Sequence, residues 1–258
     1  MKRIVIIGSG NVAEALVRGL SGVGCPPVQV WARDRTKAAG IAKLCGCEFA
    51  DDVKELAVAD IYILAVADKA IMRVAAALDF PPDSVVAHTA GSVDINVFPP
   101  AIKNRAVLYP VQTFTKGRTV DFSEIPILVE GSSPSALRQV TEVAQILSGK
   151  VQEMSSERRM MIHAAAVFAC NFTNYMYSVG EELAREAGTD FEILKPLVAE
   201  TANKAVAASS PRDVQTGPAV RNDFETRSRH AELLAQKPYL QNIYINISKN
   251  IWETSKKT

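Results

Sequence analysis

The feature that most constrains the fold is a strand pattern that runs directly into a glycine-rich loop near the start of the chain. Residues 4–7 are an unbroken run of isoleucine and valine. Such a run is typical of a strand buried on both faces of a parallel sheet. It ends at Gly8, and residues 11–22 then place Val12, Leu16 and Leu20 at helical spacing. The chain therefore begins with a predicted strand, tight turn and helix, the first part of an α/β fold.

The loop itself matches the dinucleotide-binding fingerprint, with alanine in the third glycine position. Gly8 allows a sharp turn, and Gly10 lets the backbone approach a pyrophosphate. Ala13 allows close packing of helix on strand, and the first amides of the helix face the phosphates. The expected cofactor-binding residues of the loop are Gly8, Ser9, Gly10, Asn11, Val12 and Ala13. The alternative is a glycine turn in another kind of α/β protein.

The end of the second predicted strand, residues 28–31, favours NADP over NAD. Ala32 stands where an acidic residue would bind the ribose hydroxyls of NAD. Arg33 follows, and a guanidinium suits a ribose 2′-phosphate because it can bind such oxyanions through two hydrogen bonds. If the strand runs longer, Asp34 becomes a ribose ligand and the cofactor is NAD. In a further alternative, Arg33 and Arg35 are solvated loop charges.

Strand and helix patterns alternate over the first 153 residues. Further strands are expected at residues 60–66, 84–87, 105–109 and 125–129, and helices at residues 35–46, 68–78 and 134–147. Beyond residue 153 only helices are expected, at residues 156–187, 191–207, 223–235 and 239–255. We therefore predict a doubly wound, Rossmann-type parallel α/β sheet followed by an all-α domain. The predicted domains are an NADP-binding domain at residues 1–153 and a helical substrate and dimerisation domain at residues 154–258.

Composition and charge narrow the classes of partner. With 29 Lys and Arg against 28 Asp and Glu, and no long basic run, nucleic acid is not expected as a partner. No apolar stretch is long enough for a membrane span or a signal core, so we expect a cytoplasmic protein with no membrane partner. The four cysteines lack zinc-site spacing, so reduced thiols and no metal site are expected. Long, alanine-rich helices with apolar surface favour a homodimer.

Four later segments carry a resemblance to a known family. They read His-Thr-Ala-Gly-Ser at residues 88–92, Tyr-Pro-Val-Gln-Thr-Phe at 109–114, His-Ala-Ala-Ala-Val-Phe-Ala-Cys-Asn at 163–171 and Thr-Gly-Pro-Ala-Val-Arg-Asn-Asp at 216–223. With the glycine loop and residues 31–35 and 60–68, they resemble NADP oxidoreductases with a Rossmann-like domain and a helical domain of unknown function. That branch belongs to the superfamily of pyrroline-5-carboxylate reductase, 6-phosphogluconate and β-hydroxyacid dehydrogenases, and F420-dependent NADP reductase. The resemblance implies the fold and NADP(H); at Tyr109 it leads us to expect histidine instead.

Ligands of open α/β sheets bind at the carboxyl ends of the parallel strands, so residues just beyond those ends are candidates for binding. The residues expected at the cofactor are Val66, Ala67, Asp68, Ala90 and Gly91. Those expected at the substrate are His88, Ser92, Gln112 and Thr113. The alternative for residues 88–92 is a turn that caps a strand.

The helix predicted at residues 156–187 carries the candidate catalytic residues. His163, Val167, Asn171 and Asn174 fall on one helical stripe. His163 could give a proton to a carbonyl or imine, Asn171 could fix the substrate oxygen, and Asn174 could line the pocket. The alternative is a set of side chains hydrogen-bonded in a helix interface. β-Hydroxyacid dehydrogenases carry a lysine on the corresponding helix, and residues 156–187 contain none, so histidine replaces it or the reaction differs.

The loop at residues 216–223 adds a last candidate. Arg221 could bind a substrate carboxylate through two hydrogen bonds, whereas Asp223 could cap the next helix. The sequence thus favours an NADP(H)-dependent oxidoreductase that acts by hydride transfer on a small, anionic carbonyl, hydroxy or imine substrate. Two alternatives stay open: a non-catalytic NADP(H)-binding sensor or regulator, and a reductase that uses a deazaflavin as its other redox partner.

Overall fold

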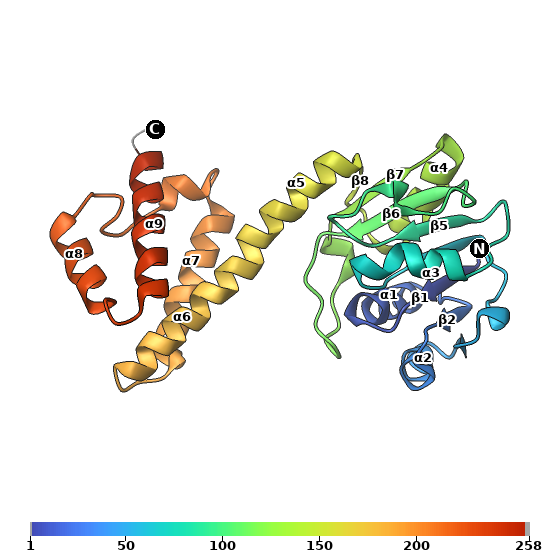
Figure 1. Cartoon of the computed structure of the whole chain (residues 1–258), viewed down its shortest axis with the longest axis horizontal. Coiled ribbons are helices and arrows are strands. Elements are labelled where there is room, and N and C mark those ends of the chain that lie inside the picture. Colours follow the sequence, from blue (N-terminus) through green and yellow to red (C-terminus); the bar gives the residue numbers. More distant parts are fainter. Residues whose placement is uncertain (1, 256–258) are drawn as a thin grey trace. The chain divides into compact units, whose positions relative to one another are not determined.

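A computed structural model describes residues 2–255 of the chain, which divides into two compact units, Met1–Cys170 and Asn171–Thr258. The first unit is built on one eight-stranded sheet of order β3-β2-β1-β4-β5-β6-β7-β8 (Figure 1). Its strands are β1 (Ile4–Ile7), β2 (Gln29–Trp31), β3 (Glu48–Ala50), β4 (Ile61–Leu64), β5 (Val85–His88), β6 (Arg105–Pro110), β7 (Ile127–Gly131) and β8 (Val151–Glu153). Every neighbouring pair is parallel except β6 and β7. The predicted Rossmann-type sheet is confirmed.

The strand order reverses between β1 and β4, which lie side by side although β2 and β3 come between them in the sequence. In open α/β sheets ligands bind outside the carboxyl ends of the strands at such a reversal. The helices of this unit are α1 (Asn11–Gly22), α2 (Arg35–Ala42), α3 (Ile71–Ala77), α4 (Pro134–Leu147) and α5 (Ser156–Ala166). The glycine loop that precedes α1 therefore lies at the position where a dinucleotide is expected.

Two apolar layers cover the two faces of the sheet. Ile4 and Ile6 belong to one layer and Val5 and Ile7 to the other, and all four side chains are fully buried. The alternating strand thus contributes to both cores, as predicted for a strand with no solvent-facing side. Burial of each such side chain contributes about 1.5–3 kcal/mol to folding relative to exposure.

Three local features differ from the prediction. The strands β3 and β8 have three residues each and were not expected. The helix predicted at residues 156–187 is α-helical only in α5 and in α6 (Thr173–Glu186), because Val167–Phe172 adopts π-helical geometry. A π-helix bonds i to i+5, so it rotates the residues that follow it relative to an α-helix. The α-helical spacing from which a stripe of His163, Val167, Asn171 and Asn174 was predicted is therefore interrupted at Val167–Phe172.

Helix α5 belongs to the first unit, beyond the domain boundary predicted at residue 153. The physical reason is the side chain of Arg159 in the first turn of α5. It is buried to 1% exposure and forms an ion pair with Glu130 of β7. A charge in that environment is stabilised only by its partners, so the pair ties α5 to the sheet.

The second unit is helical, as predicted. Its elements are α6, a 3₁₀ turn (Phe191–Leu194), α7 (Lys195–Ala207), a second 3₁₀ turn (Pro211–Val214), α8 (Phe224–Leu233) and α9 (Pro238–Ser255). Asp223 caps α8 by accepting a hydrogen bond from the amide of Thr226 at 3.0 Å, in agreement with its predicted role. Lys237 forms ion pairs with Glu182 and Glu186 of α6. Between residues 2 and 255, no helix combines the length and the apolar character needed to cross a membrane.

Candidate functional site

The loop between β1 and α1 has the geometry of a phosphate-binding turn. Gly8 has a φ of +135°, and a Cβ atom on it would lie 2.2 Å from the carbonyl oxygen of Ala65. Gly10 occupies the N-cap position of α1, and a Cβ on it would meet nothing within 4 Å. Gly10 has no side chain with which to cap α1, so the first amides of the helix are available to an anion. Glycine is thus required at position 8 because a side chain there would collide with the backbone of Ala65. At position 10 it leaves space for a ligand.

The other loop residues divide between packing and binding. Ala13 is fully buried against the core, and Val12 packs partly on it. The side-chain amide of Asn11 donates to the carbonyl of Phe114 at 2.9 Å. Asn11 could therefore serve a dinucleotide only through its backbone, whereas Ser9 is half-buried and lines the clefts on both sides of the loop.

A cleft of about 450 Å³ lies beside the glycine loop and the end of β2. The residues that line it are Gly8, Ser9, Trp31, Ala32, Arg33, Asp34, Lys37, Val66, Ala67, Ala70 and Val74. A second cleft of about 670 Å³ shares Ser9 and Lys37 with it and adds Gly10, Asn11 and Lys116 among others. Four predicted loop residues, Gly8, Ser9, Gly10 and Asn11, thus line these clefts together with Arg33, Val66 and Ala67.

The charged residues after β2 have distinct partners. Arg35 pairs with Asp51 at 2.7 Å and lies over the ring of Phe49 at 5.1 Å. The carboxylate of Asp34 accepts a hydrogen bond from the amide of Lys37 at 3.1 Å, and this bond holds the pKa of Asp34 below its usual value. Within residues 2–255, Arg33 is exposed and forms no hydrogen bond or ion pair. Of these groups Arg33 is the one available for a phosphate, while Asp34 acts as a helix cap.

The loops that follow β4 and β5 are joined by a hydrogen bond. The hydroxyl of Ser92 donates to the Asp68 carboxylate at 2.8 Å, and the hydroxyl of Thr89 reaches the carbonyl of Leu64 at 3.5 Å. A residue predicted to contact the cofactor, Asp68, therefore contacts one predicted for the substrate, Ser92. The first loop follows β4, which adjoins the reversal of strand order, and the second follows β5, the next strand in the sheet.

His88, at the end of β5, corrects one prediction. Its side chain has no exposed surface, so it cannot contact a substrate directly. Nδ1 accepts a hydrogen bond from the amide of Ala90 at 3.2 Å, and Nε2 has no partner within residues 2–255. Burial, aided by the nearby Arg159 cation, lowers the pKa of His88 to about 4. His88 is a neutral core residue that shapes the turn through Ala90 and Gly91.

Gly91 lies against two side chains from distant parts of the sequence. A Cβ atom on Gly91 would lie 2.7 Å from Nδ1 of His163 and 2.7 Å from the ring of Tyr109. The Tyr109 hydroxyl and His163 Nδ1 are 3.2 Å apart, within hydrogen-bond distance. The structure thus brings the predicted catalytic histidine to the loop after β5. It also adds Tyr109, which was not among the predicted site residues.

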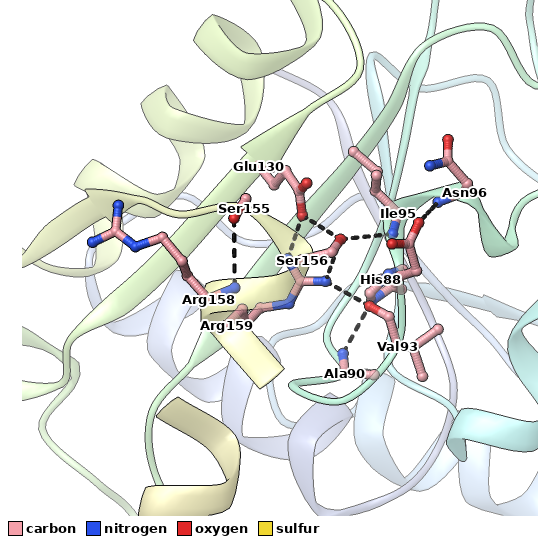
Figure 2. A network of polar contacts seen from close by, with 11 residues as sticks. His88, Ala90, Val93, Ile95, Asn96, Glu130, Ser155, Ser156, Arg158 and Arg159 are labelled. Carbon is pink, nitrogen blue, oxygen red and sulfur yellow. Dashed lines mark hydrogen bonds and ion pairs between the residues drawn. The ribbon is translucent and has the colours of Figure 1, made fainter. Parts of the chain in front are cut away.

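A buried network fixes the helix that carries His163 (Figure 2). The guanidinium of Arg159 donates to Glu130, to the carbonyl of Val93 and to the hydroxyl of Ser156. Ser156 donates in turn to Glu130 at 2.7 Å and accepts from the amide of Ile95 at 3.0 Å. The network therefore links α5, β7 and the loop at residues 93–95, which lies just beyond Gly91 and Ser92. Sequence reasoning did not single out Arg159 or Glu130.

The remaining predicted site residues have no shared site in this structure. Gln112 and Thr113 are exposed beyond β6, where the amide of Thr113 donates to the side chain of Gln112 at 2.8 Å. Asn171, Asn174 and Arg221 are exposed residues of the second unit. Their roles stay predictions.

Two family models match the chain. Residues 3–91 match the model described as NADP oxidoreductase, coenzyme F420-dependent, and residues 125–251 match a domain of unknown function, DUF2520. No curated relative matches this chain. The matched segments correspond to the first half of the sheet and to the region from β7 to α9.

Solved structures give the family and the fold. A Bacteroides fragilis protein described as a "putative NADP oxidoreductase" is 36% identical over 98% of both chains, with a TM-score of 0.90. A Thermotoga maritima protein is 21% identical over 98% of both chains (TM-score 0.77), which shows the same fold. So does a pyrroline-5-carboxylate reductase from Coxiella burnetii, 18% identical over 99% of this chain and 98% of that one (TM-score 0.58). The chain belongs to the NADP oxidoreductase family in which a domain of the coenzyme F420-dependent type precedes a helical domain of unknown function.

Proposed function

We propose that this protein binds NADP(H) at the glycine loop and catalyses hydride transfer between it and a small, anionic carbonyl, hydroxy or imine compound. The observation that carries the proposal is the combination of an uncapped α1, an open Gly10 and a free Arg33 at two clefts that share Ser9 and Lys37. The α1 amides would bind the pyrophosphate, and Arg33 would bind the 2′-phosphate. The bound nicotinamide supplies the hydride, so the chain must orient the substrate and provide a proton.

The proposed proton donor is His163. It is half-buried, and Tyr109 and Gly91 hold its imidazole beside the loop that follows β5. A histidine can exchange a proton near neutral pH, as general acid chemistry at a carbonyl or imine requires. Ser92 and Asp68 would line the same region from the two neighbouring loops. The anionic character of the substrate rests on the exposed guanidinium of Arg221, and the role of Asn171 at a substrate oxygen stays part of this proposal.

The experiment is to follow NADPH oxidation with a panel of oxo acids and cyclic imines. Once a substrate is found, His163→Gln should lower turnover about 100-fold or more while NADPH affinity changes little. His230→Gln is the matched control, because His230 pairs with Tyr244 in the second unit just as His163 pairs with Tyr109. Near-normal turnover in folded His163→Gln would overturn the assignment. NADPH that binds but is never oxidised by any panel member would favour a sensor.

We also propose that the second unit forms a homodimer. Its described residues, 171–255, include four buried apolar side chains, Ala184, Ala219, Leu234 and Leu240. Five large apolar side chains among the same residues are exposed by 63% or more: Ile193, Leu197, Val206, Phe224 and Leu233. So much apolar surface on a unit with so small a core supports a second copy of the chain as its partner.

A further inference from the structure

We propose that Tyr109 is the positioning residue of His163: its hydroxyl occupies Nδ1, so that neutral His163 presents Nε2–H as the donor toward a ligand. The role of Nε2–H toward a ligand rests on the proposed function, whereas the Tyr109–His163 contact and its test require no substrate. It adds to the site a residue at the position where the family resemblance led us to expect histidine. It also specifies which atom of His163 is available.

Three contacts hold the rings of Tyr109 and His163 together. The Tyr109 hydroxyl lies 3.2 Å from His163 Nδ1, and the rings meet edge to face with centroids 6.0 Å apart. Gly91 packs against both, with no room for a Cβ between them. Tyr109 itself is buried, at the end of β6. Tyr109 and Gly91 thus both lie against the Nδ1 side of the His163 ring.

The backbone of His163 is fixed one helical turn earlier. Arg159 precedes His163 by four residues, so both side chains leave the same face of α5. Its guanidinium binds Glu130, Val93 and Ser156, and the side chain is buried (Figure 2). The ion pair thus holds α5 against β7 and the loop after β5. The main chain of His163 is therefore already placed, and Tyr109 orients its imidazole ring.

The hydrogen bond of the Tyr109 hydroxyl determines which nitrogen of neutral His163 carries the proton. Burial raises the pKa of Tyr109, with smaller effects from Arg159, which lowers it, and from Asp68 and Cys170, which raise it. Tyr109 therefore keeps its proton near neutral pH. Within residues 2–255, His163 Nδ1 is the one acceptor that its hydroxyl reaches, and a buried hydroxyl rarely forgoes an acceptor. With Nδ1 accepting, the proton of neutral His163 must be on Nε2.

The arrangement has a consequence for the substrate. An Nε2–H group donates, so the substrate atom that faces it is an acceptor, such as a carbonyl oxygen or an imine nitrogen. If His163 becomes an imidazolium, its Nδ1–H can donate to the Tyr109 oxygen, since a phenol both donates and accepts. Tyr109 therefore holds the same ring orientation in both charge states of His163.

The test is ¹⁵N NMR of the imidazoles in the full-length protein, which has three histidines. His88→Gln and His230→Gln assign the signals by loss. Neutral His163 should be in the Nε2–H form. In Tyr109→Phe, the fraction protonated at Nδ1 should rise about fivefold, the change that one hydrogen bond of about 1 kcal/mol produces. Phenylalanine keeps the ring that packs on Gly91, so folding should persist, and unchanged amide spectra elsewhere would show it.

Tyr244→Phe is the matched control. The Tyr244 hydroxyl lies 2.9 Å from Nδ1 of His230, so this variant should change the His230 signal and leave that of His163 unaltered. A wild-type His163 protonated at Nδ1, or a folded Tyr109→Phe protein whose His163 signals match the wild type, would overturn the inference. These spectra are recorded without cofactor or substrate, so failure to bind or oxidise NADPH would instead count against the proposed function alone.

Discussion

The three histidines of the chain lie in three different environments. His88 is fully buried, His163 is half-buried beside Tyr109, and His230 is exposed beside Tyr244. Residue type alone predicts the same chemistry for all three. His88 does not share that chemistry, because burial disfavours its charged form: a cation without a compensating partner is costly in the core. At the residue scale, burial and partners therefore decide which histidine can serve a ligand.

His88 should make folding stability depend on pH. Its pKa is about 4 in the folded protein, below the roughly 6.5 of an unfolded histidine, so below pH 6.5 the unfolded state binds more protons. The contribution is fully present above pH 6.5 and is lost as the pH falls toward 4, on the order of 3 kcal/mol in total. Urea unfolding of wild type and His88→Gln at pH 7 and pH 4.5 measures it. The wild type should lose more stability between the two pH values than the variant, and equal losses would contradict the account.

The positions of candidate site residues were predictable from sequence where the motif is local. The glycine loop and Arg33 lie within one strand–helix–strand segment, so spacing alone located them. The buried network was not predictable, because Arg159 is 29 residues from Glu130 and 66 from Val93. Its members meet only through the antiparallel pairing of β6 with β7 and the packing of α5. Tyr109 was missed for the same reason, since its partner His163 is 54 residues away.

The helix α1 combines a buried face with an open N-terminus. Its buried face includes Ala13, Leu16 and Leu20, and its N-terminus is open beside Gly10. The two glycines of the loop should therefore respond differently to substitution. Gly10 faces free space, whereas Gly8 meets a backbone carbonyl and has a positive φ.

Gly10→Val should abolish NADPH binding and leave the melting temperature near that of the wild type, because the added side chain enters only the ligand space. Gly8→Ala should lower stability by at least about 1–3 kcal/mol, because it strains the backbone and forces a contact with Ala65. Thermal melts and NADPH titrations of both variants give the comparison. If Gly10→Val bound NADPH normally, the cofactor would have to lie elsewhere.

Long elements were predicted better than short ones. The helix predicted at residues 134–147 matches α4, with Ser133 as its cap, since both periodicity and capping signals are present. The strands β3 and β8 have too few residues for a period to show, and β3 has one buried position. The π-helical segment Val167–Phe172 has no signature in apolar spacing, so the sequence suggested a regular helix there.

At the scale of the whole molecule, the chain pairs a unit with a two-layer core and a helical unit with little core of its own. The first gains stability from the buried sheet, which local patterns predict well. The second exposes Leu197 and Val206 of α7 by 63% and 87%. We propose that a second copy of the chain covers this apolar surface.

The homodimer prediction can be tested by light scattering coupled to gel filtration. The wild type should be a dimer at micromolar concentration, since apolar surface of this kind is covered in stable homodimers. Leu197→Glu with Val206→Glu should shift the protein toward monomer, because each would bury an unpaired charge. Glu200→Gln on the same helix is the control. A monomeric wild type would refute the proposal.

The central claim, that this chain is built to hold NADP(H), is tested most directly by calorimetric titration with NADPH and NADH. Wild type should bind NADPH more tightly. Arg33→Ala should weaken NADPH by about 1.5–3 kcal/mol, the range for a hydrogen bond to a charged group, and leave NADH nearly unchanged. Arg35→Ala, whose guanidinium already pairs with Asp51, should change neither. Equal losses for the two cofactors in Arg33→Ala, or a wild type that prefers NADH, would contradict the account.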